Sequence, residues 1–187
     1  FVRVVKRMDL AKYTTNTIIT SVLPVLGVLF SCPLVAYSLT LVPWKGGKVI
    51  FPVILFTTMI PWQVTQIPMY SIWAKLGLTN TFVPLILPSF LGSAYYIYLC
   101  RQYMKSLPKS VIEAARIDGA NHIQVLVKIL LPLTKATLAV LVLYYGVMIW
   151  NSWFWAANIL KQRESMPLAV LLRDILINSQ MQAMDSG

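Results

Sequence analysis

The chain has 187 residues, of which 58% are hydrophobic and 12% are charged, and its formal net charge is +10. A typical soluble domain has about 25% charged residues, so this composition excludes an ordinary soluble globular protein. The basic residues lie at the edges of apolar runs and form no stripe with interleaved aromatic residues. This distribution is typical of the flanks of membrane segments and argues against nucleic acid as a partner.

Residues 1–12 combine basic and apolar residues, which predicts a helix lying on the membrane surface. Four apolar windows without Asp, Glu, Lys, Arg or His follow, at residues 13–44, 49–74, 76–100 and 136–160. Each window exceeds the ~20 residues that a helix needs to cross the hydrocarbon core of a bilayer. They predict an all-α, polytopic transmembrane helical bundle with spans at residues 14–42, 49–72, 81–100 and 135–156.

Many prolines lie inside these windows: Pro24, Pro33, Pro52, Pro61, Pro68, Pro84 and Pro88. A membrane helix survives an internal proline, because neighbouring helices re-satisfy the freed backbone groups. The resulting kinks suit a transport pathway, and they also suit plain packing. Tight turns are expected at residues 44–48 and 75–80, between the first three spans.

Residues 105–135 hold the only concentrated charge in the interior of the chain. Either Pro108 or Ser110 can begin a helix there, since proline tolerates the first turn and Ser110 has capping-box spacing to Glu113. Gly119 weakens or ends that helix, because glycine accepts positive φ. A second short helix follows, with Asn121 as its cap and Pro132 at its end or at its junction with the next run.

This loop carries Glu113-Ala114-Ala115, then Gly119, and then Ile129-x-Leu131-Pro132. The spacing resembles the EAA motif of ABC importer permeases, and Asp118 and Ala120 complete a form that is similar to the carbohydrate-importer branch. An ordinary amphipathic connecting helix would not predict the downstream Ile-x-Leu-Pro. The small residues Ala114, Ala115 and Gly119 would let a partner's backbone approach closely. Glu113 offers a charge that a partner arginine could hold.

The resemblance implies that residues 101–134 form a cytoplasmic coupling loop and that residues 157–187 are extracytoplasmic. In that family the coupling helix docks in a cleft of the ATP-hydrolysing subunit. The expected partners are two ATP-binding subunits that bind ATP and Mg, a second permease subunit, an extracytoplasmic solute-binding protein and membrane lipid. The expected location is the inner membrane of a bacterial cell. Positive charge alone does not orient the chain, because each side would carry eight basic residues.

Further segments resemble permeases for oligosaccharides and polysaccharide fragments, and together they cover nearly the whole chain. They are Asn16, Gly77-Leu78-x-Asn80, Asn151-Ser152-Trp153-Phe154, Pro167-Leu168 and Leu172-Arg173. Such permeases usually have six spans, so we expect residues 1–187 to be a single permease domain that lacks a first and a last span. After the fourth span, Pro167 is expected to start a short amphipathic helix, and no fifth span is visible.

These patterns favour the membrane-spanning subunit of an ATP-driven carbohydrate importer, and not an enzyme. An importer of another solute, such as an amino acid or a peptide, is one alternative. A secondary carrier or channel is another, but such carriers usually place an ionisable residue in the membrane, and the four windows contain none. The chain has no phosphate-binding loop of the Gly-x-x-x-x-Gly-Lys-Ser/Thr type, so it is not expected to bind ATP itself.

Neither a catalytic centre nor a metal site is expected. His122 is the only histidine, and we interpret it as a surface residue of the coupling loop. Cys32 and Cys100 lie far apart in apolar runs, which indicates buried thiols without metal or redox spacing.

The candidate solute path is built from neutral polar and aromatic residues. One face of a continuous helix would carry Tyr144, Met148, Asn151 and Trp155. Trp153 belongs to the same aromatic run. Aromatic faces pack against sugar rings, and Asn and Gln both donate to and accept from hydroxyl groups. The aromatic run also suits a belt at the membrane interface, which is the simpler interpretation, and one cluster could serve both roles. Gln63 and Gln66 in the second span suit either solute contact or hydrogen bonds between helices.

Overall fold

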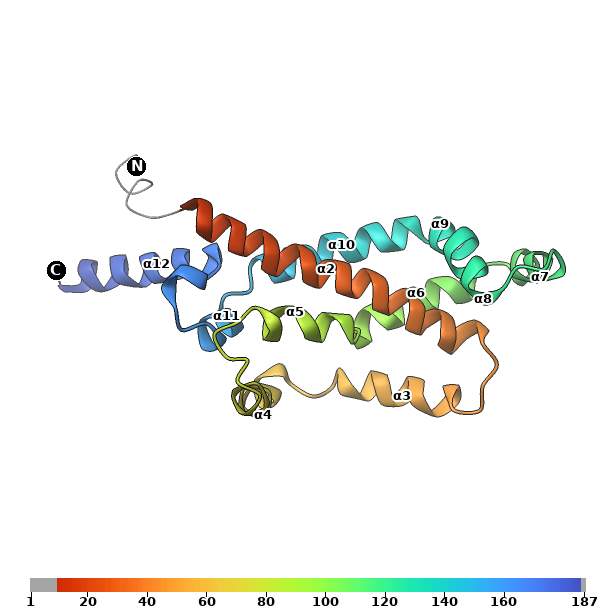
Figure 1. Ribbon diagram of the computed structural model, residues 1–187, viewed down its shortest axis with the longest axis horizontal. Coiled ribbons are helices and arrows are strands. Elements are labelled where there is room, and N and C mark those ends of the chain that lie inside the picture. The colour runs from red at the N-terminus through yellow and green to blue at the C-terminus, as the bar shows by residue number, and fades with distance from the viewer. Residues whose placement is uncertain (1–9, 186–187) are drawn as a thin grey trace.

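The computed structural model describes residues 10–185, so most of the surface helix predicted over residues 1–12 lies outside the described part (Figure 1). Every regular element in the described part is helical and none is a strand, which confirms the all-α prediction. The elements are α2 (Leu10–Leu41), α3 (Gly47–Thr57), α4 (Trp62–Lys75), α5 (Val83–Phe90), α6 (Ala94–Ser106), α7 (Lys109–Ile117), α8 (His122–Gln124), the π-helix η1 (Val125–Leu130), α9 (Leu131–Leu133), α10 (Lys135–Trp150), α11 (Phe154–Ile159), the 3-10 turn η2 (Arg163–Ser165) and α12 (Leu168–Asp185).

Helix α2 runs along most of the molecule and packs mainly against α5, α6 and α10 (Figure 1). The residues that it buries include Gly27, Ser31 and Ala36, and such small residues allow membrane helices to approach closely. A Cβ atom on Gly27 would lie 2.8 Å from the Phe90 ring of α5, so the α2–α5 contact depends on glycine. The main hydrophobic core forms around α2.

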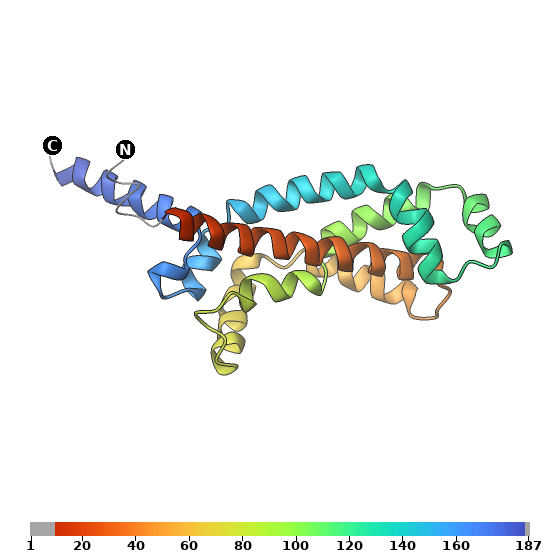
Figure 2. The same cartoon turned by 45° about the horizontal axis from the view of Figure 1, so that its top comes forward.

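The molecule is elongated, with different elements at its two ends (Figure 2). One end carries α7 and α8 beside the C-terminal end of α2, and we call it the coupling end. The other carries the N-terminal end of α2 with α11 and η2, and we call it the loop end. Helix α12 projects from the loop end, away from the bundle (Figure 2). It begins directly after Pro167, as predicted, but its 18 residues make it longer than the short helix that we expected.

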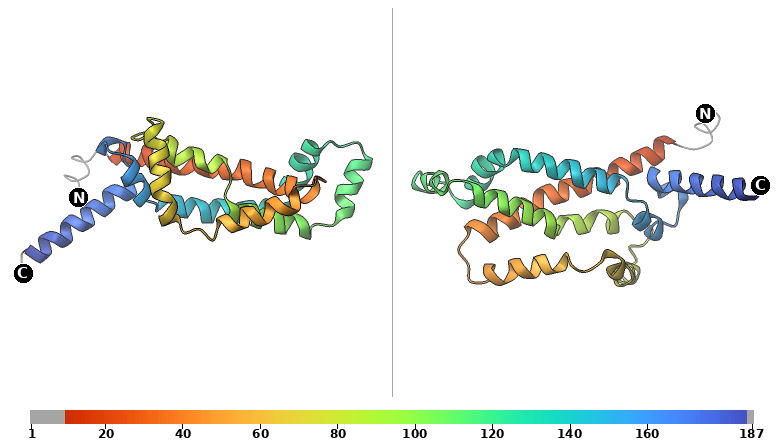
Figure 3. Two further views of the ribbon diagram at one scale, coloured as in Figure 1. Left: turned by 90° about the horizontal axis from the view of Figure 1, so that it is seen from below. Right: turned by 180° about the vertical axis from the view of Figure 1, so that it is seen from behind.

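The second predicted span, over residues 49–72, is not one continuous helix. Helices α3 and α4 are bent by 98° relative to each other, so α4 lies across the bundle (Figure 3). Thr57 and Thr58 donate their hydroxyl groups to the carbonyls of Ile54 and Leu55, which satisfies the end of α3. Pro61 then restricts the residue before it to extended conformations, so the helix cannot continue through this point.

The fourth predicted span, over residues 135–156, also differs from the structure. Helix α10 ends at Trp150, and α11 starts separately at Phe154. At its other end α10 is bent by 75° from the His122–Leu133 segment. Within the described part, only Leu10–Leu41 and Val83–Ser106 are single stretches long and apolar enough to cross a membrane, and the total rises to four if each bent pair is one span.

The third span extends beyond the end that we predicted at residue 100. Helix α6 continues to Ser106 and therefore includes Arg101 and Lys105. Between α5 and α6 the chain is interrupted at Gly92, which has a φ of 91°. In the same region Ser89 hydrogen-bonds the Tyr145 hydroxyl of α10 at 2.8 Å.

Two asparagines hold the segment that leads from α11 to α12. The Asn80 side-chain oxygen accepts hydrogen bonds from the backbone N–H groups of Lys161 and Gln162, each at 3.0 Å. Asn80 has a φ of 63°, and its own N–H donates to the carbonyl of Ile159 at 2.9 Å. Asparagine tolerates this left-handed conformation better than most residues do. The turn before α5 is thereby fastened to the loop end.

Asn16 of α2 fastens the same segment from the other side. Its side-chain nitrogen donates to the carbonyls of Glu164 and Met166, at 2.8 and 3.2 Å. One turn away, Lys12 forms an ion pair with Glu164 at 2.8 Å, and this hydrogen bond lowers the pKa of the Glu164 carboxyl group. The pair is exposed to solvent, so we assign the main anchoring role to the asparagines.

We predict that Asn80→Ala opens this segment, whereas Asn80→Asp does not. Alanine removes the acceptor and disfavours positive φ, while aspartate keeps an oxygen at the same position. Each lost hydrogen bond contributes about 1 kcal/mol, so local opening should become about tenfold more frequent or more. Trypsin cleavage after Lys161 and Arg163 in the purified complex measures this opening. Equal cleavage rates for Asn80→Ala and the unaltered chain would contradict the prediction.

Candidate coupling site and solute path

Helix α7, which carries the predicted coupling residues Glu113, Ala114 and Ala115, ends at a glycine cap. The Gly119 N–H donates to the carbonyl of Arg116, and the Ala120 N–H donates to that of Ala115, both at 3.0 Å. Gly119 has a φ of 81°, and these two bonds form a Schellman motif. The predicted role of Gly119 as the end of the first helix is confirmed.

The first turns of the two helices in this loop, α7 and α8, are capped in different ways. Pro108 directly precedes α7 as its N-cap, and no side chain caps this helix. Of the two starts left open, the structure has the one at Pro108, and Ser110 already lies inside the first turn without capping it. Asn121 does cap the following helix. Its side chain accepts from the Gln124 N–H, and Gln124 returns a bond to the Asn121 N–H, both at 2.9 Å.

One face of α7 is buried against the rest of the chain. Ile112 and Ala115 are 5% and 8% exposed, and they share the main core with Val125 and Leu130 of η1. The small size of Ala115 therefore serves packing inside this chain. Our expectation that Ala115 lies open to a partner's backbone is wrong.

The opposite face of α7 is exposed and partly apolar. It carries Glu113, Ala114 and Ile117, with Asp118 at its end, and we call it the outer face. Ile117 is 86% exposed, and Ile123 of the neighbouring α8 is 73% exposed. Large apolar side chains with charged neighbours on an open surface typically mark a docking site for another protein. The sequence analysis missed both isoleucines, although apolar residues on either side of the Asp118–Asn121 turn were a possible signal.

Polar contacts tie the coupling loop to the C-terminal end of α2. Arg116 donates from a terminal nitrogen to the carbonyl of Leu41 at 3.1 Å. The C-terminus of a helix favours both a hydrogen-bond donor and a positive charge, and Arg116 supplies both. The Tyr37 hydroxyl forms a hydrogen bond with Nδ1 of His122 at 2.8 Å, and the two rings meet edge to face. His122 is exposed, as predicted, but it also serves as an anchor.

The remaining predicted coupling residues do not lie on α7. Ile129 belongs to η1 and packs against the main core, whereas Leu131 and Pro132 form α9 at the bend that precedes α10. These three residues therefore belong to the link between the coupling helices and the bundle. Within the described residues, no group of three or more His, Cys, Asp or Glu side chains gathers in a way that suits a metal ion.

The predicted face of the solute path is interrupted. Tyr144 and Met148 are exposed on α10, but Asn151 caps that helix and donates its side-chain N–H to the carbonyl of Val147 at 2.8 Å. The chain turns after Asn151, so Trp155 lies on α11 and not on a continuation of the α10 face. The single four-residue face is therefore wrong at Trp155, although Asn151 still lies at the end of α10.

Trp153 and Trp155 of this run both contact other elements of the chain. The Trp155 indole donates to the carbonyl of Pro84 at 3.3 Å and meets the Trp62 ring edge to face at 5.5 Å. The Arg173 guanidinium of α12 stacks over the Trp153 ring at 3.5 Å. Such contacts fix the aromatic run against neighbouring elements at the loop end.

Gln63 and Gln66 lie on α4, beyond the bend that separates it from α3. Gln63 is exposed and Gln66 is half-buried. Neither amide has a hydrogen-bond partner among the described residues, so no bond between helices of this chain explains them. Both side chains remain open to a solute or to a neighbouring subunit.

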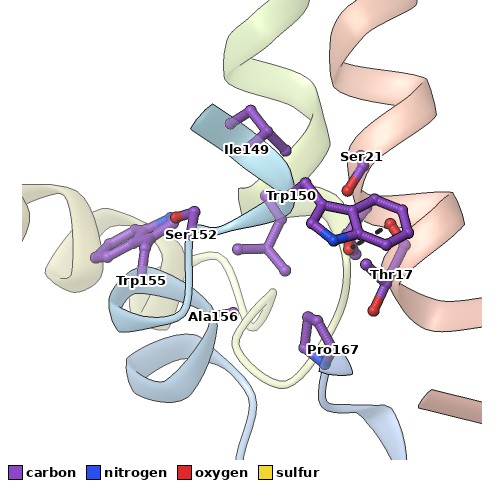
Figure 4. A pocket seen from close by; sticks show the side chains of 10 residues that line it. Thr17, Ser21, Ile149, Trp150, Ser152, Trp155, Ala156 and Pro167 are labelled. Carbon is purple, nitrogen blue, oxygen red and sulfur yellow. Dashed lines mark hydrogen bonds between the residues drawn. The ribbon is translucent and has the colours of Figure 1, made fainter. Parts of the chain in front are cut away.

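A small cavity lies between α2, α10 and α11 at the loop end (Figure 4). Its volume of about 50 Å³ accommodates a few water molecules, at roughly 10–15 Å³ each. Hydroxyl groups of Thr17, Thr20 and Ser21 line it together with the rings of Trp150 and Trp155. In Figure 4 the Trp150 ring lies beside Thr17 and Ser21, and Trp155 lies on the other side, near Ser152. The sequence analysis missed the three hydroxyl residues, whose i, i+3, i+4 spacing on α2 was the available signal. The lining suits a polar solute, but the cavity is small for a sugar ring.

The sequence was compared with those of known proteins. Residues 17–185 match the family described as "Binding-protein-dependent transport system inner membrane component". The arabinooligosaccharides transport system permease protein AraQ of Halalkalibacterium halodurans is 34% identical over 84% of this chain and 56% of its own length. The polygalacturonan/rhamnogalacturonan transport system permease protein YtcP of Bacillus subtilis is 31% identical over 85% of this chain and 56% of its own.

A solved structure gives a similar result. It is the crystal structure of a bacterial ABC transporter involved in the import of the acidic polysaccharide alginate, and one of its chains superposes with a TM-score of 0.81. The identity is 34%, and the match covers 89% of this chain and 59% of that one. The chain spans a little over half the length of the curated relatives that it matches. On this combined agreement of sequence and fold, the chain belongs to the family of inner membrane components of binding-protein-dependent transport systems and is a multi-pass membrane protein.

Proposed function

We propose that the chain forms part of the membrane-spanning subunit of an ATP-driven importer whose solute is an oligosaccharide or a polysaccharide fragment. The similarity to permeases named for arabinooligosaccharides and for polygalacturonan/rhamnogalacturonan supports this solute class. The exposed aromatic and amide side chains toward the loop end suit such a solute chemically. The subunit itself does not hydrolyse ATP in this proposal, since partner subunits bind ATP and Mg.

The outer face of α7 is the observation that carries the coupling part of the proposal. An ATP-binding subunit docks on Glu113, Ala114 and Ile117, on the cytoplasmic side of the membrane. Two such subunits, a second permease subunit and an extracytoplasmic solute-binding protein complete the transporter. In this arrangement loop 101–134 is cytoplasmic and residues 157–187 are extracytoplasmic.

Movement of the ATP-binding subunit reaches the bundle through contacts that are already present. The buried side of α7 packs on η1, and Arg116 and His122 bond directly to the end of α2. Because packed interfaces move as units and deform little, we expect α7 and α2 to move together. The bends beside α9 and between α3 and α4 are the places where the spans can change direction.

The solute class is tested by ATP hydrolysis in the complex that co-purifies with the whole permease. The complex is placed in lipid, and a binding protein loaded from a panel of oligosaccharides is added. We expect one loaded sugar to stimulate hydrolysis, because solute delivery is coupled to the ATP-binding subunits. Hydrolysis that responds to a loaded amino acid or peptide instead would contradict the carbohydrate assignment.

We predict that Ile117→Asp prevents docking of the ATP-binding subunit. The carboxylate would face the apolar pocket that receives Ile117, and burying an unpaired charge costs several kcal/mol. Co-purification of the ATP-binding subunit should therefore fall at least about tenfold. Met184→Asp is the matched control, because Met184 is similarly exposed, at 83%, but lies on α12. Equal retention of the ATP-binding subunit by both variants would show that α7 is not part of the docking site.

We also predict that Gly119→Pro uncouples hydrolysis from transport. Proline fixes φ near −65°, whereas Gly119 has a φ of 81°, and proline also lacks the N–H that bonds to Arg116. The end of α7 would then be reshaped while its outer face persists, so hydrolysis should continue and uptake should be lost. Gly119→Asn serves as the control, because asparagine accepts left-handed φ. Normal uptake by the proline variant would exclude α7 as a rigid lever.

A further inference from the structure

An arginine near the coupling end has no anionic partner. The guanidinium carbon of Arg101 on α6 lies 3.7 Å from the centre of the Phe51 ring on α3. Its Nε atom is buried without a hydrogen-bond partner, and no carboxylate among the described residues pairs with this side chain. The residue as a whole is half-buried, and a cation without an anionic partner on a membrane helix is costly, so an anion from outside the described residues is expected to neutralise it.

Two lysines lie at the same level of the bundle. Helix α3 runs away from the coupling end and α6 runs toward it (Figure 1). Lys48 precedes Phe51 by one turn, and Lys105 follows Arg101 by one turn, so both lysines lie closer to the coupling end than the stack does. Both lysine side chains are exposed. Three cations therefore gather along the junction of α3 and α6.

The aromatic contacts fix this junction. The Phe51 ring also stacks on Tyr98 of α6, with 6.5 Å between ring centres and 14° between planes. Tyr98, Arg101 and Lys105 are spaced to share one face of α6. The arginine is thus held in place before any ligand arrives, and its planar guanidinium can bind two oxygens of an oxyanion such as phosphate at once.

Helix α3 has an open apolar face, and Lys48 lies between this face and the side of α3 that carries Phe51. Val49, Val53 and Phe56 of α3 are exposed, at 65%, 55% and 66%. Together with the cations they match a molecule that has an anionic head and a hydrocarbon tail. We propose that Arg101, Lys105 and Lys48 bind the phosphate of an anionic phospholipid whose acyl chain lies along α3. The lipid would belong to the cytoplasmic leaflet, an assignment that rests on the orientation in the proposed function.

The test measures phosphatidylglycerol bound to the whole transporter. The complex is delipidated, titrated with phosphatidylglycerol in phosphatidylcholine nanodiscs, and analysed for retained lipid by mass spectrometry. Each basic residue near a membrane surface contributes about fivefold to binding of anionic lipid. We expect about fivefold weaker retention for Arg101→Gln and about 25-fold weaker retention for the double variant with Lys105→Gln. Lipid retention by Arg101→Lys should lie between that of the unaltered chain and that of Arg101→Gln, because lysine keeps the charge but loses the planar guanidinium.

Lys128→Gln is the matched control. It removes one exposed positive charge from the same end of the molecule, on η1 and away from the α3–α6 junction, and should change retention less than twofold. Inorganic phosphate is added in a separate arm, and failure of phosphate to displace the lipid supports a lipid site. Size-exclusion chromatography checks that each variant is folded.

Unchanged retention in Arg101→Gln would overturn the proposal. Loss of the second permease subunit from the Arg101→Gln complex, with lipid retention unchanged, would also overturn the proposal, because Arg101 would then serve a protein interface. Displacement of the lipid by inorganic phosphate would also overturn it, in favour of a free-anion site. The assay contains neither ATP nor sugar, so its outcome is independent of whether the proposed transport activity is correct.

Discussion

The close packing of α2 is the interaction on which the rest of the structure depends. This helix has 32 residues, and it presents small side chains to α5, α6 and α10. At the loop end its Asn16 side chain holds the segment before α12, and at the coupling end its last carbonyls and Tyr37 hold α7 and α8. One stiff helix therefore contacts both the region that would meet solute and the region that would meet the ATP-binding subunit.

Under the proposed function, this arrangement lets a chain whose four apolar windows contain no Asp, Glu, Lys, Arg or His take part in active transport. A carrier driven by an ion gradient places charged residues inside the membrane, at considerable cost. Here most charged groups of the bundle lie near the ends of the helices, where the outer face of α7 is open to a partner. The energy can then enter mechanically at one end, while the bends in the remaining spans let them follow the movement of α2.

Some of this was predictable from sequence and some was not. Gly119 and Asn121 act through neighbouring backbone groups, so local spacing was sufficient to predict their roles. The lengths of the apolar windows indicated where apolar helices lie. They did not predict the bend near Pro61 or the end of α10 at Trp150. Hydropathy does not register the side-chain hydrogen bonds that end a helix early. The partners of Asn16 and Asn80 lie far away in the sequence, and no single-sequence pattern could identify them. The inward position of Ala115 likewise depends on η1, whose π-helical turn had no recognisable signal.

The central claim is that α7 and α2 move as one body, and a distance measurement within the membrane subunit tests it most directly. Spin labels would be placed at Lys109 on α7 and Leu34 on α2, both exposed, after replacement of Cys32 and Cys100 by alanine. A second pair would join Leu34 to the corresponding helix of the second permease subunit. On binding of ATP by the assembled transporter, we expect the Lys109–Leu34 distance to stay constant while the distance between subunits changes. A change in the Lys109–Leu34 distance would show that the coupling helix moves independently of α2 and would contradict the account.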